Sequence, residues 1–187
     1  MPRLAPLPLA DIPADLAETM RAGEALMGFT PNDALTMARN PALLRAMFGL
    51  VQAIYGPSRL PSDLKRLIGT MTSAAAGCRY CEAHATHGAV KAGVEDTKLA
   101  ALWDYERSDL FDARERAALR VAQLAGQVPN AVTDADFAAL EPHFDEDEII
   151  EIVAVIALFG FLNRWNSTLA TDLEATPMAA AKRIKQG

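Results

Sequence analysis

Hydrophobic residues recur at intervals of three and four along most of the chain, which is the spacing of an amphipathic helix. After Asn40 and Pro41 the apolar series comprises Leu43, Leu44, Met47, Leu50, Val51 and Ile54, and Gly56 ends it. An asparagine followed by proline is typical of a helix start, because asparagine caps the first turn and proline fits its first position. The pattern therefore predicts a helix from Pro41 to just before Gly56.

The same spacing predicts further helices over 14–27, 61–76 and 78–92, and a short one over 95–105. Three capping boxes predict the starts of the remaining helices, which cover 113–127, a brief segment before Pro142, and 146–170. These boxes are Asp112 with Glu115, Thr133 with Asp136, and Asp145 with Glu148. Strand signals are almost absent, so we expect an all-α fold of about seven to nine helices.

The chain of 187 residues is long enough for one domain with a substantial core, and no Gly/Ser-rich or Pro-rich linker divides it. We therefore expect a single domain over 1–187, in which 1–12 form an irregular N-terminal arm. Segments 63–81 and 146–164 share an acidic start, an apolar helix and a glycine-marked junction. This echo suggests a degenerate helix-pair repeat, although helix pairs also produce such echoes by chance.

The net charge of -6 comes from 24 acidic and 18 basic residues that are scattered along the chain. Without a basic cluster to neutralise phosphates, nucleic acid is not an expected partner. The longest apolar run, 152–162, is too short to span a bilayer and is interpreted as a buried helix, so no membrane association is expected. The N-terminus is interrupted by prolines and does not resemble a secretory signal, so we expect a soluble, cytoplasmic protein.

Reactive side chains are concentrated in 73–93, which contains both cysteines and two of the three histidines. In a reducing cytosol an isolated Cys-x-x-Cys pair is better explained by redox cycling or metal binding than by a structural disulfide. Cys78 lies at a predicted helix start, where free backbone N–H groups favour a thiolate. Cys81 and His84 are three residues apart and can touch. The segment therefore predicts a thiol pair with an adjacent proton acceptor, able to close a disulfide.

Zinc binding is the first alternative, because Cys78, Cys81, His84 and His87 provide four ligand types at regular intervals. Each step of three residues turns a side chain about 60° round a helix, so one ion cannot reach all four. No metal and no bound cofactor is predicted. The second alternative is that both cysteines are packed core residues. His87 is interpreted mainly as a packing or surface residue and kept as an auxiliary candidate.

The sequence GCRYCEAHATHGAVKAG, preceded by DLKRLIGTMTSAAA, resembles the carboxymuconolactone decarboxylase and alkylhydroperoxidase AhpD-like family. The later segment GFLNRWNSTLATDLE is similar to the C-terminal helix of the larger, peroxidase-related members. The resemblance implies an AhpD-like helical bundle that assembles into homo-oligomers. For the AhpD branch it also implies a peroxidase in which histidine activates the second cysteine, the first cysteine resolves the disulfide, and a lipoylated protein is the reductant.

Two positions depart from this family pattern. The helping histidine usually lies four residues after the second cysteine, where this chain has Ala85, so His84 is the nearest substitute. A glutamate usually lies twelve residues before the first cysteine, where this chain has Arg66. Glu151, inside an apolar helix, is a candidate replacement, since a carboxylate there needs a partner or a raised pKa. The alternative is an ion pair with an arginine such as Arg66 or Arg164.

The leading hypothesis is a thiol-dependent oxidoreductase that reduces a hydroperoxide or a disulfide through Cys78 and Cys81, with a lipoylated or thioredoxin-like reductant. Two alternatives remain open: a carboxymuconolactone decarboxylase-like lyase that does not need the cysteines, and a non-catalytic oligomeric protein that senses redox state or binds a ligand. Homo-oligomerisation is expected because a chain of this size can hardly bury all its apolar residues, among them Met47, Phe48, Phe159 and Phe161.

Overall fold

Helices make up nearly all of the regular structure of the chain. The structure is a computed structural model and describes residues 1–186. Its α-helices are α1 (Ala14–Met27), α2 (Asn32–Met37), α3 (Pro41–Tyr55), α4 (Ser62–Ala75), α5 (Arg79–Lys91), α6 (Asp96–Ala100), α7 (Ala113–Ala125), α8 (Asp134–Ala138), α9 (Glu146–Leu169) and α10 (Ala175–Gln186). Two short 3-10 turns, η1 (Leu9–Asp11) and η2 (Leu102–Asp104), complete the set. No β-strand occurs in residues 1–186, and the predicted all-α class is confirmed.

The helix starts that the sequence marked with capping residues are all present. The side chain of Asn40 accepts a hydrogen bond from the backbone N–H of Leu43 at 3.2 Å, with Pro41 as the first residue of α3. All three predicted capping boxes form at the starts of α7, α8 and α9. Each cap satisfies backbone groups that the first helical turn leaves unpaired, so it fixes the helix start locally.

Two helices were not predicted from the sequence, and the ten α-helices of the described residues exceed the expected seven to nine. Helix α2 has only 6 residues, too few to show a helical period. Helix α10 is rich in alanine and has few large apolar residues, so its hydrophobic pattern is weak. The predicted helix over 95–105 is divided into α6 and η2. The predicted arm, 1–12, is irregular apart from η1.

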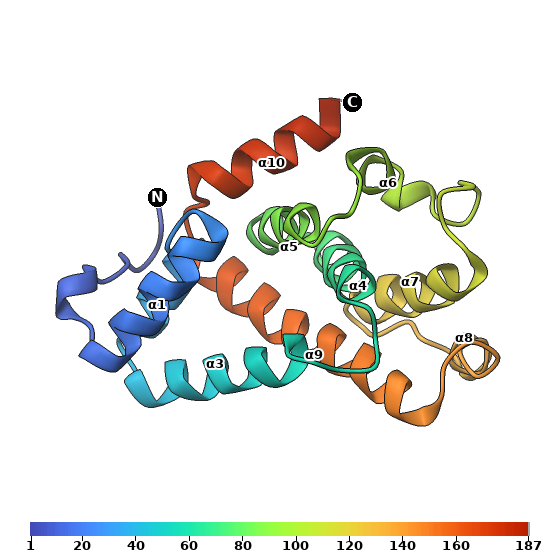
Figure 1. Cartoon of the computed structure of the whole chain (residues 1–187), viewed down its shortest axis with the longest axis horizontal. Coiled ribbons are helices and arrows are strands. Elements are labelled where there is room, and N and C mark those ends of the chain that lie inside the picture. Colours follow the sequence, from blue (N-terminus) through green and yellow to red (C-terminus); the bar gives the residue numbers. More distant parts are fainter. Residues whose placement is uncertain (187) are drawn as a thin grey trace.

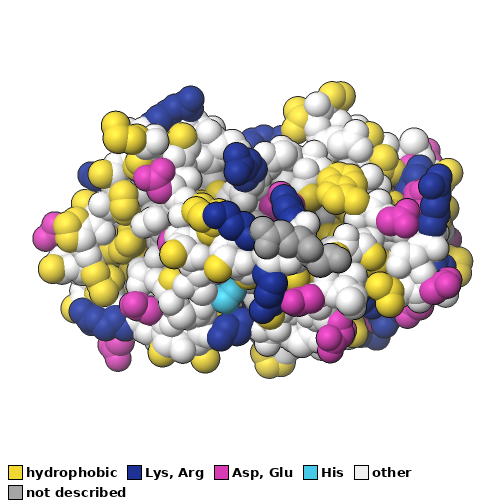
Figure 2. Space-filling view, turned by 90° about the horizontal axis from the view of Figure 1, so that it is seen from above, with side chains coloured by type: hydrophobic (Ala, Val, Ile, Leu, Met, Phe, Trp, Pro, Cys, Tyr) yellow, Lys and Arg dark blue, Asp and Glu magenta, His cyan; other side chains and the backbone are white. Residues whose placement is uncertain are grey.

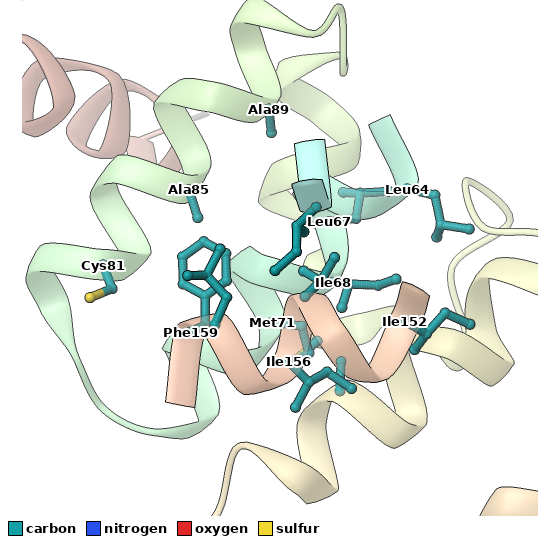
Figure 3. Packing of buried hydrophobic residues seen from close by; sticks show 14 of the residues in the cluster. Leu64, Leu67, Ile68, Met71, Cys81, Ala85, Ala89, Ile152, Ile156 and Phe159 are labelled. Atoms are coloured by element: carbon teal, nitrogen blue, oxygen red, sulfur yellow. The ribbon is translucent and has the colours of Figure 1, made fainter. Parts of the chain in front are cut away.

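Helix α4 lies in the middle of the bundle and packs against α5, α7 and α9, while α10 covers α5 (Figure 1). Gly69 allows the close approach of α4 and α9, because a Cβ at this position would overlap the ring of Phe159. In Figure 3, Cys81, Ala85 and Ala89 follow one another along α5, and Ala85 and Phe159 point toward each other. Where α4, α5 and α9 pack together, apolar side chains therefore lie beside the first turn of α5.

The surface carries charges of both signs. On the face that α10 covers, Lys and Arg side chains gather across the middle, with acidic and apolar side chains between and around them (Figure 2). Residues 1–186 include no helix with the length and hydropathy needed to cross a membrane.

Candidate active site

The first cysteine occupies the N-cap of α5. Gly77 has a φ of 69°, which turns the chain between α4 and α5, and Cys78 follows in extended conformation. Glycine adopts this left-handed conformation without the steric cost that a side chain would add. The backbone N–H of Cys78 donates to the carbonyl of Ser73 at 3.0 Å, so the turn is anchored on the end of α4. Cys78 and Cys81 are both free thiols and each is 2% exposed.

The environment of the two cysteines gives them opposite ionisation. The pKa of Cys78 is lowered to about 6, chiefly by a hydrogen bond from the Cys81 thiol; burial opposes the shift, while the N–H groups of Cys81 and Tyr80 and the Ser167 hydroxyl add to it. The pKa of Cys81 is raised by its hydrogen bond to Cys78 and by burial. The pair therefore holds its negative charge on Cys78, whereas the resemblance implied activation of the second cysteine.

Asn166 on α9 links Cys81 to a carboxylate. Its Nδ2 atom lies 3.4 Å from the Cys81 sulfur and 3.2 Å from Oδ2 of Asp33, and the side chain is only 2% exposed. A buried amide that donates to the sulfur fixes the orientation of the thiol. The sequence offered no signal for this contact, since it joins residues 85 apart in the chain.

His84 is held by a carboxylate that the sequence analysis did not identify. Its Nε2 atom lies 2.6 Å from Oε2 of Glu174, in the segment that precedes α10, and its ring stacks on Tyr80 with centroids 4.1 Å apart. The Tyr80 hydroxyl donates to Oε1 of Glu174 at 2.8 Å, and the backbone N–H of Asn32 donates to the same oxygen. In the part of the chain that the structure describes, no hydrogen bond joins His84 to a sulfur.

These hydrogen bonds determine the ionisation of Glu174. Burial opposes the negative charge, but the hydrogen bond and charge of His84 and the N–H of Asn32 outweigh it, so the pKa of Glu174 is lowered. Glu174 therefore remains a carboxylate that positions His84 and Tyr80. The segment GFLNRWNSTLATDLE ends at Glu174, so the resemblance reached this residue without indicating its role.

Two auxiliary candidates lie outside this arrangement. His87 is engaged by the backbone instead of a sulfur, with Nε2 2.8 Å from the carbonyl oxygen of Met27. Glu151 accepts from the backbone N–H groups of Arg59 and Leu60 and pairs with Lys65 at 3.1 Å. Of the two interpretations of Glu151, these contacts favour the structural ion pair over a replacement of the family glutamate, and the partner is Lys65 rather than an arginine.

Cys81 lies on the wall of a small apolar cavity of about 240 Å³. Most of the wall comes from apolar side chains of α2, α3, α5 and α9. The lining residues are Met27, Pro31, Asp33, Ala34, Met37, Leu44, Met47, Phe48, Val51, Tyr55, Arg66, Tyr80, Cys81, His84, Ala85, Leu158, Phe159 and Leu162. Cys78 does not line this cavity, so Cys81 is the sulfur that a molecule inside it would meet, and the volume admits only a small molecule.

The four residues counted as zinc ligands in the sequence do not converge. His84 bonds to Glu174 and His87 to a backbone carbonyl, while the two cysteines hydrogen-bond to each other. Over residues 1–186, no group of three or more His, Cys, Asp or Glu side chains is arranged to hold a metal ion.

Comparison of the sequence with known proteins identifies the family of this chain. The profile of the carboxymuconolactone decarboxylase family matches residues 41–124, which include both cysteines. The uncharacterized protein YnjA of Escherichia coli (strain K12) is 32% identical over 129 residues, which cover 66% of this chain and 70% of YnjA. The chain belongs to the carboxymuconolactone decarboxylase family.

Three solved structures extend the comparison over nearly the whole chain. The debrominase Bmp8 in its apo form is 38% identical, with 96% of both chains covered and a TM-score of 0.89. A cysteine-to-alanine variant of Bmp8 in complex with 2,3,4-tribromopyrrole is 37% identical, with a TM-score of 0.90. An uncharacterized peroxidase-related protein from Ralstonia eutropha JMP134, described as an alkylhydroperoxidase AhpD core, is 27% identical over 94% of both chains, with a TM-score of 0.84. The AhpD-like fold is thereby confirmed.

Proposed function

We propose that this protein is a thiol-dependent reductase that transfers two electrons from Cys78 and Cys81 to a small apolar substrate. One observation carries the proposal: Cys81 lines a small apolar cavity, while Cys78, three residues earlier at the N-cap of the same helix, does not line it. A sulfur that meets the substrate and a second sulfur that can displace the product are the two parts that a disulfide-forming reduction needs.

An organic hydroperoxide is the first candidate substrate. Cys78 accepts the proton of Cys81 through their hydrogen bond, and the Cys81 sulfur attacks the terminal peroxide oxygen. An S–O bond forms, the O–O bond breaks, and the alcohol leaves after its oxygen takes a proton, for which His84 on the cavity wall is the donor. The Cys78 sulfur then displaces the hydroxyl from the sulfenic acid, so water leaves and a disulfide forms. An external dithiol, such as a lipoylated or thioredoxin-like protein, restores the thiols.

A halogenated aromatic ring is the second candidate, because the similarity to the debrominase Bmp8 extends over 96% of the chain. In this reaction a sulfur attacks the halogen, the carbon–halogen bond breaks, and the ring carbon takes a proton. The second sulfur then displaces halide and closes the same disulfide. Each substrate molecule again accepts two electrons from the pair, so both candidates use the same site and the same external dithiol.

A substrate panel distinguishes these possibilities. The reduced protein is mixed with dithiothreitol and either cumene hydroperoxide or 2,3,4-tribromopyrrole, and peroxide loss or bromide release is followed. We expect turnover of one of them, and loss of that turnover in both Cys78→Ser and Cys81→Ser. Unchanged turnover in either variant would overturn the proposal and favour a lyase that does not need the cysteines. Formation of the disulfide without turnover would favour a redox-sensing protein.

A further inference from the structure

The end of the cavity away from Cys81 contains a cation whose charge no described residue neutralises. Arg66 of α4 lines the cavity, and its Nε atom is buried without a hydrogen-bond partner. Two acidic side chains are engaged elsewhere: Glu151 pairs with Lys65, and Asp33, which also lines the cavity, accepts from Asn166. Among residues 1–186, no carboxylate forms a salt bridge with Arg66. Arg66 as a whole is only partly buried, but a buried donor atom without a partner calls for an explanation.

The guanidinium is held in a fixed position. Its central carbon lies 3.9 Å from the centre of the Tyr55 ring, a cation–π contact. On another side it packs on Gly88 of α5 so closely that a Cβ there would lie 2.9 Å from Nη1. Because the ring and the helix backbone orient it, Arg66 need not lose much side-chain freedom when it binds a ligand.

Tyr55 provides a second donor at the same end. Its hydroxyl is buried and has no hydrogen-bond partner among the described residues, although Tyr55 also lines the cavity. Burial raises the pKa of Tyr55 to about 12, against the opposing charge of Arg66, so the hydroxyl keeps its proton at neutral pH. A guanidinium that no described carboxylate neutralises and the neighbouring phenol O–H form a donor pair suited to an anionic group.

The cavity wall carries charges of opposite sign at two places along α5, Arg66 at one and Asp33 at the other. Gly88, on which Arg66 packs, is seven residues beyond Cys81, which corresponds to about 10 Å along the helix axis. At the Cys81 end the wall includes Asp33, which is joined to the sulfur through Asn166. An anion is therefore attracted to the Arg66 end and repelled from the Asp33 end, and the apolar wall lies between them.

We infer that this cavity binds a small apolar monoanion, such as a single-ring aromatic carboxylate or phenolate, with the anionic group on Arg66 and Tyr55 and the ring toward Cys81. The inference rests on the proposed function only in taking this cavity as the substrate's site. It predicts that, among small apolar molecules, those that carry an anionic group bind this cavity more tightly than neutral ones.

Equilibrium binding measurements test the preference for an anion and do not require the protein to turn over a substrate. Benzoate and its neutral analogue benzamide are titrated into the reduced protein by calorimetry. We expect benzoate to bind more tightly than benzamide, and Arg66→Met to weaken benzoate at least about tenfold while benzamide changes little. Arg164→Met is the matched control, because Arg164 is exposed on α9 and, among the described residues, hydrogen-bonds only the Gly160 carbonyl of its own helix. This variant should bind benzoate like the wild type.

Two further variants decide the matter if Arg66→Met does not fold. Tyr55→Phe removes one donor and keeps the ring, so benzoate affinity should fall by about threefold to tenfold. Arg66→Lys keeps the charge and should retain preference for benzoate over benzamide. Equal affinities for the two ligands in the wild type, or unchanged benzoate affinity in folded Arg66→Met, would overturn the inference. Failure of the thiol chemistry would leave these affinities as expected, so the two proposals can fail separately.

Discussion

At the scale of single residues, Cys78 owes its low pKa to its partner sulfur and to its position at the helix start. Absorbance of thiolate in the ultraviolet should therefore show one thiolate that is present at neutral pH and lost as the pH falls through about 6. An unperturbed cysteine would lose its thiolate near pH 8.5, so the low midpoint is diagnostic.

Cys78→Ala should abolish this transition, leaving Cys81 to ionise at higher pH. Cys81→Ala should retain it but move the midpoint upward, because the largest contribution to the shift, the hydrogen bond from Cys81, is removed. A transition near pH 6 that persists in Cys78→Ala would show that the charge resides on the other sulfur.

Glu151 is predicted to stabilise the fold without serving the thiols. Lys65 is buried, and its ammonium contacts the Ile54 carbonyl, the Ser58 hydroxyl and Glu151. Glu151→Gln removes the only carboxylate partner of this ammonium among residues 1–186 and should lower the free energy of unfolding by about 3 kcal/mol. Urea denaturation measures this loss.

The matched control is Glu18→Gln on the exposed face of α1, which should change stability by less than about 0.5 kcal/mol. The thiolate titration should be the same in Glu151→Gln and in the wild type. A shifted titration in Glu151→Gln would contradict its assignment as a purely structural residue.

At the scale of helices, the crossing of α4 and α9 depends on Gly69. A methyl group there would overlap the ring of Phe159, which lines the cavity, so Gly69→Ala should destabilise the protein by about 1–3 kcal/mol. Gly49→Ala on α3 is the control: a Cβ there meets nothing within 4 Å. It should be neutral or stabilising by up to about 1 kcal/mol, because alanine favours a helix. Thermal unfolding that ranks the two variants in the opposite order would contradict this packing.

The helices also show what the sequence could predict. Caps and hydrophobic spacing act within a few residues, so α3, α7, α8 and α9 were predicted with their starts. The Cys-x-x-Cys pair and its helix N-terminus are equally local, and they were placed correctly. Glu174 meets His84 across 90 residues and Tyr80 across 94, and no local pattern reports such a contact. Arg66 was noted as a departure from the family and as a possible ion-pair partner of Glu151. The sequence could not show that Glu151 pairs with Lys65 instead, because that depends on where the side chains finally lie.

At the scale of the whole molecule, one face of α9 remains apolar and exposed. Ile150 is 68% exposed, Val153 41% and Phe161 40%, and their spacing places them along one side of the helix. Met47 and Phe159, in contrast, are buried within the chain, so they do not contribute to the predicted homo-oligomer. We expect light scattering to give a mass that is a multiple of one chain.

Phe161→Glu should shift this mass toward a single chain, because a charge in an apolar contact is costly. Leu26→Glu is the control: Leu26 is 74% exposed on α1, remote in sequence from α9, and its change should leave the mass unaltered. A wild-type mass equal to one chain at micromolar concentration would contradict the expected assembly.

The most direct test of the thiol-pair mechanism is the stoichiometry of one turnover. The fully reduced protein is mixed, without external reductant, with a limiting amount of the substrate identified in the panel. Free thiols are then counted, and the linked cysteines are identified by mass spectrometry. The mechanism predicts two thiols lost and one Cys78–Cys81 disulfide formed for each substrate molecule reduced. Substrate converted while both thiols remain free would contradict it.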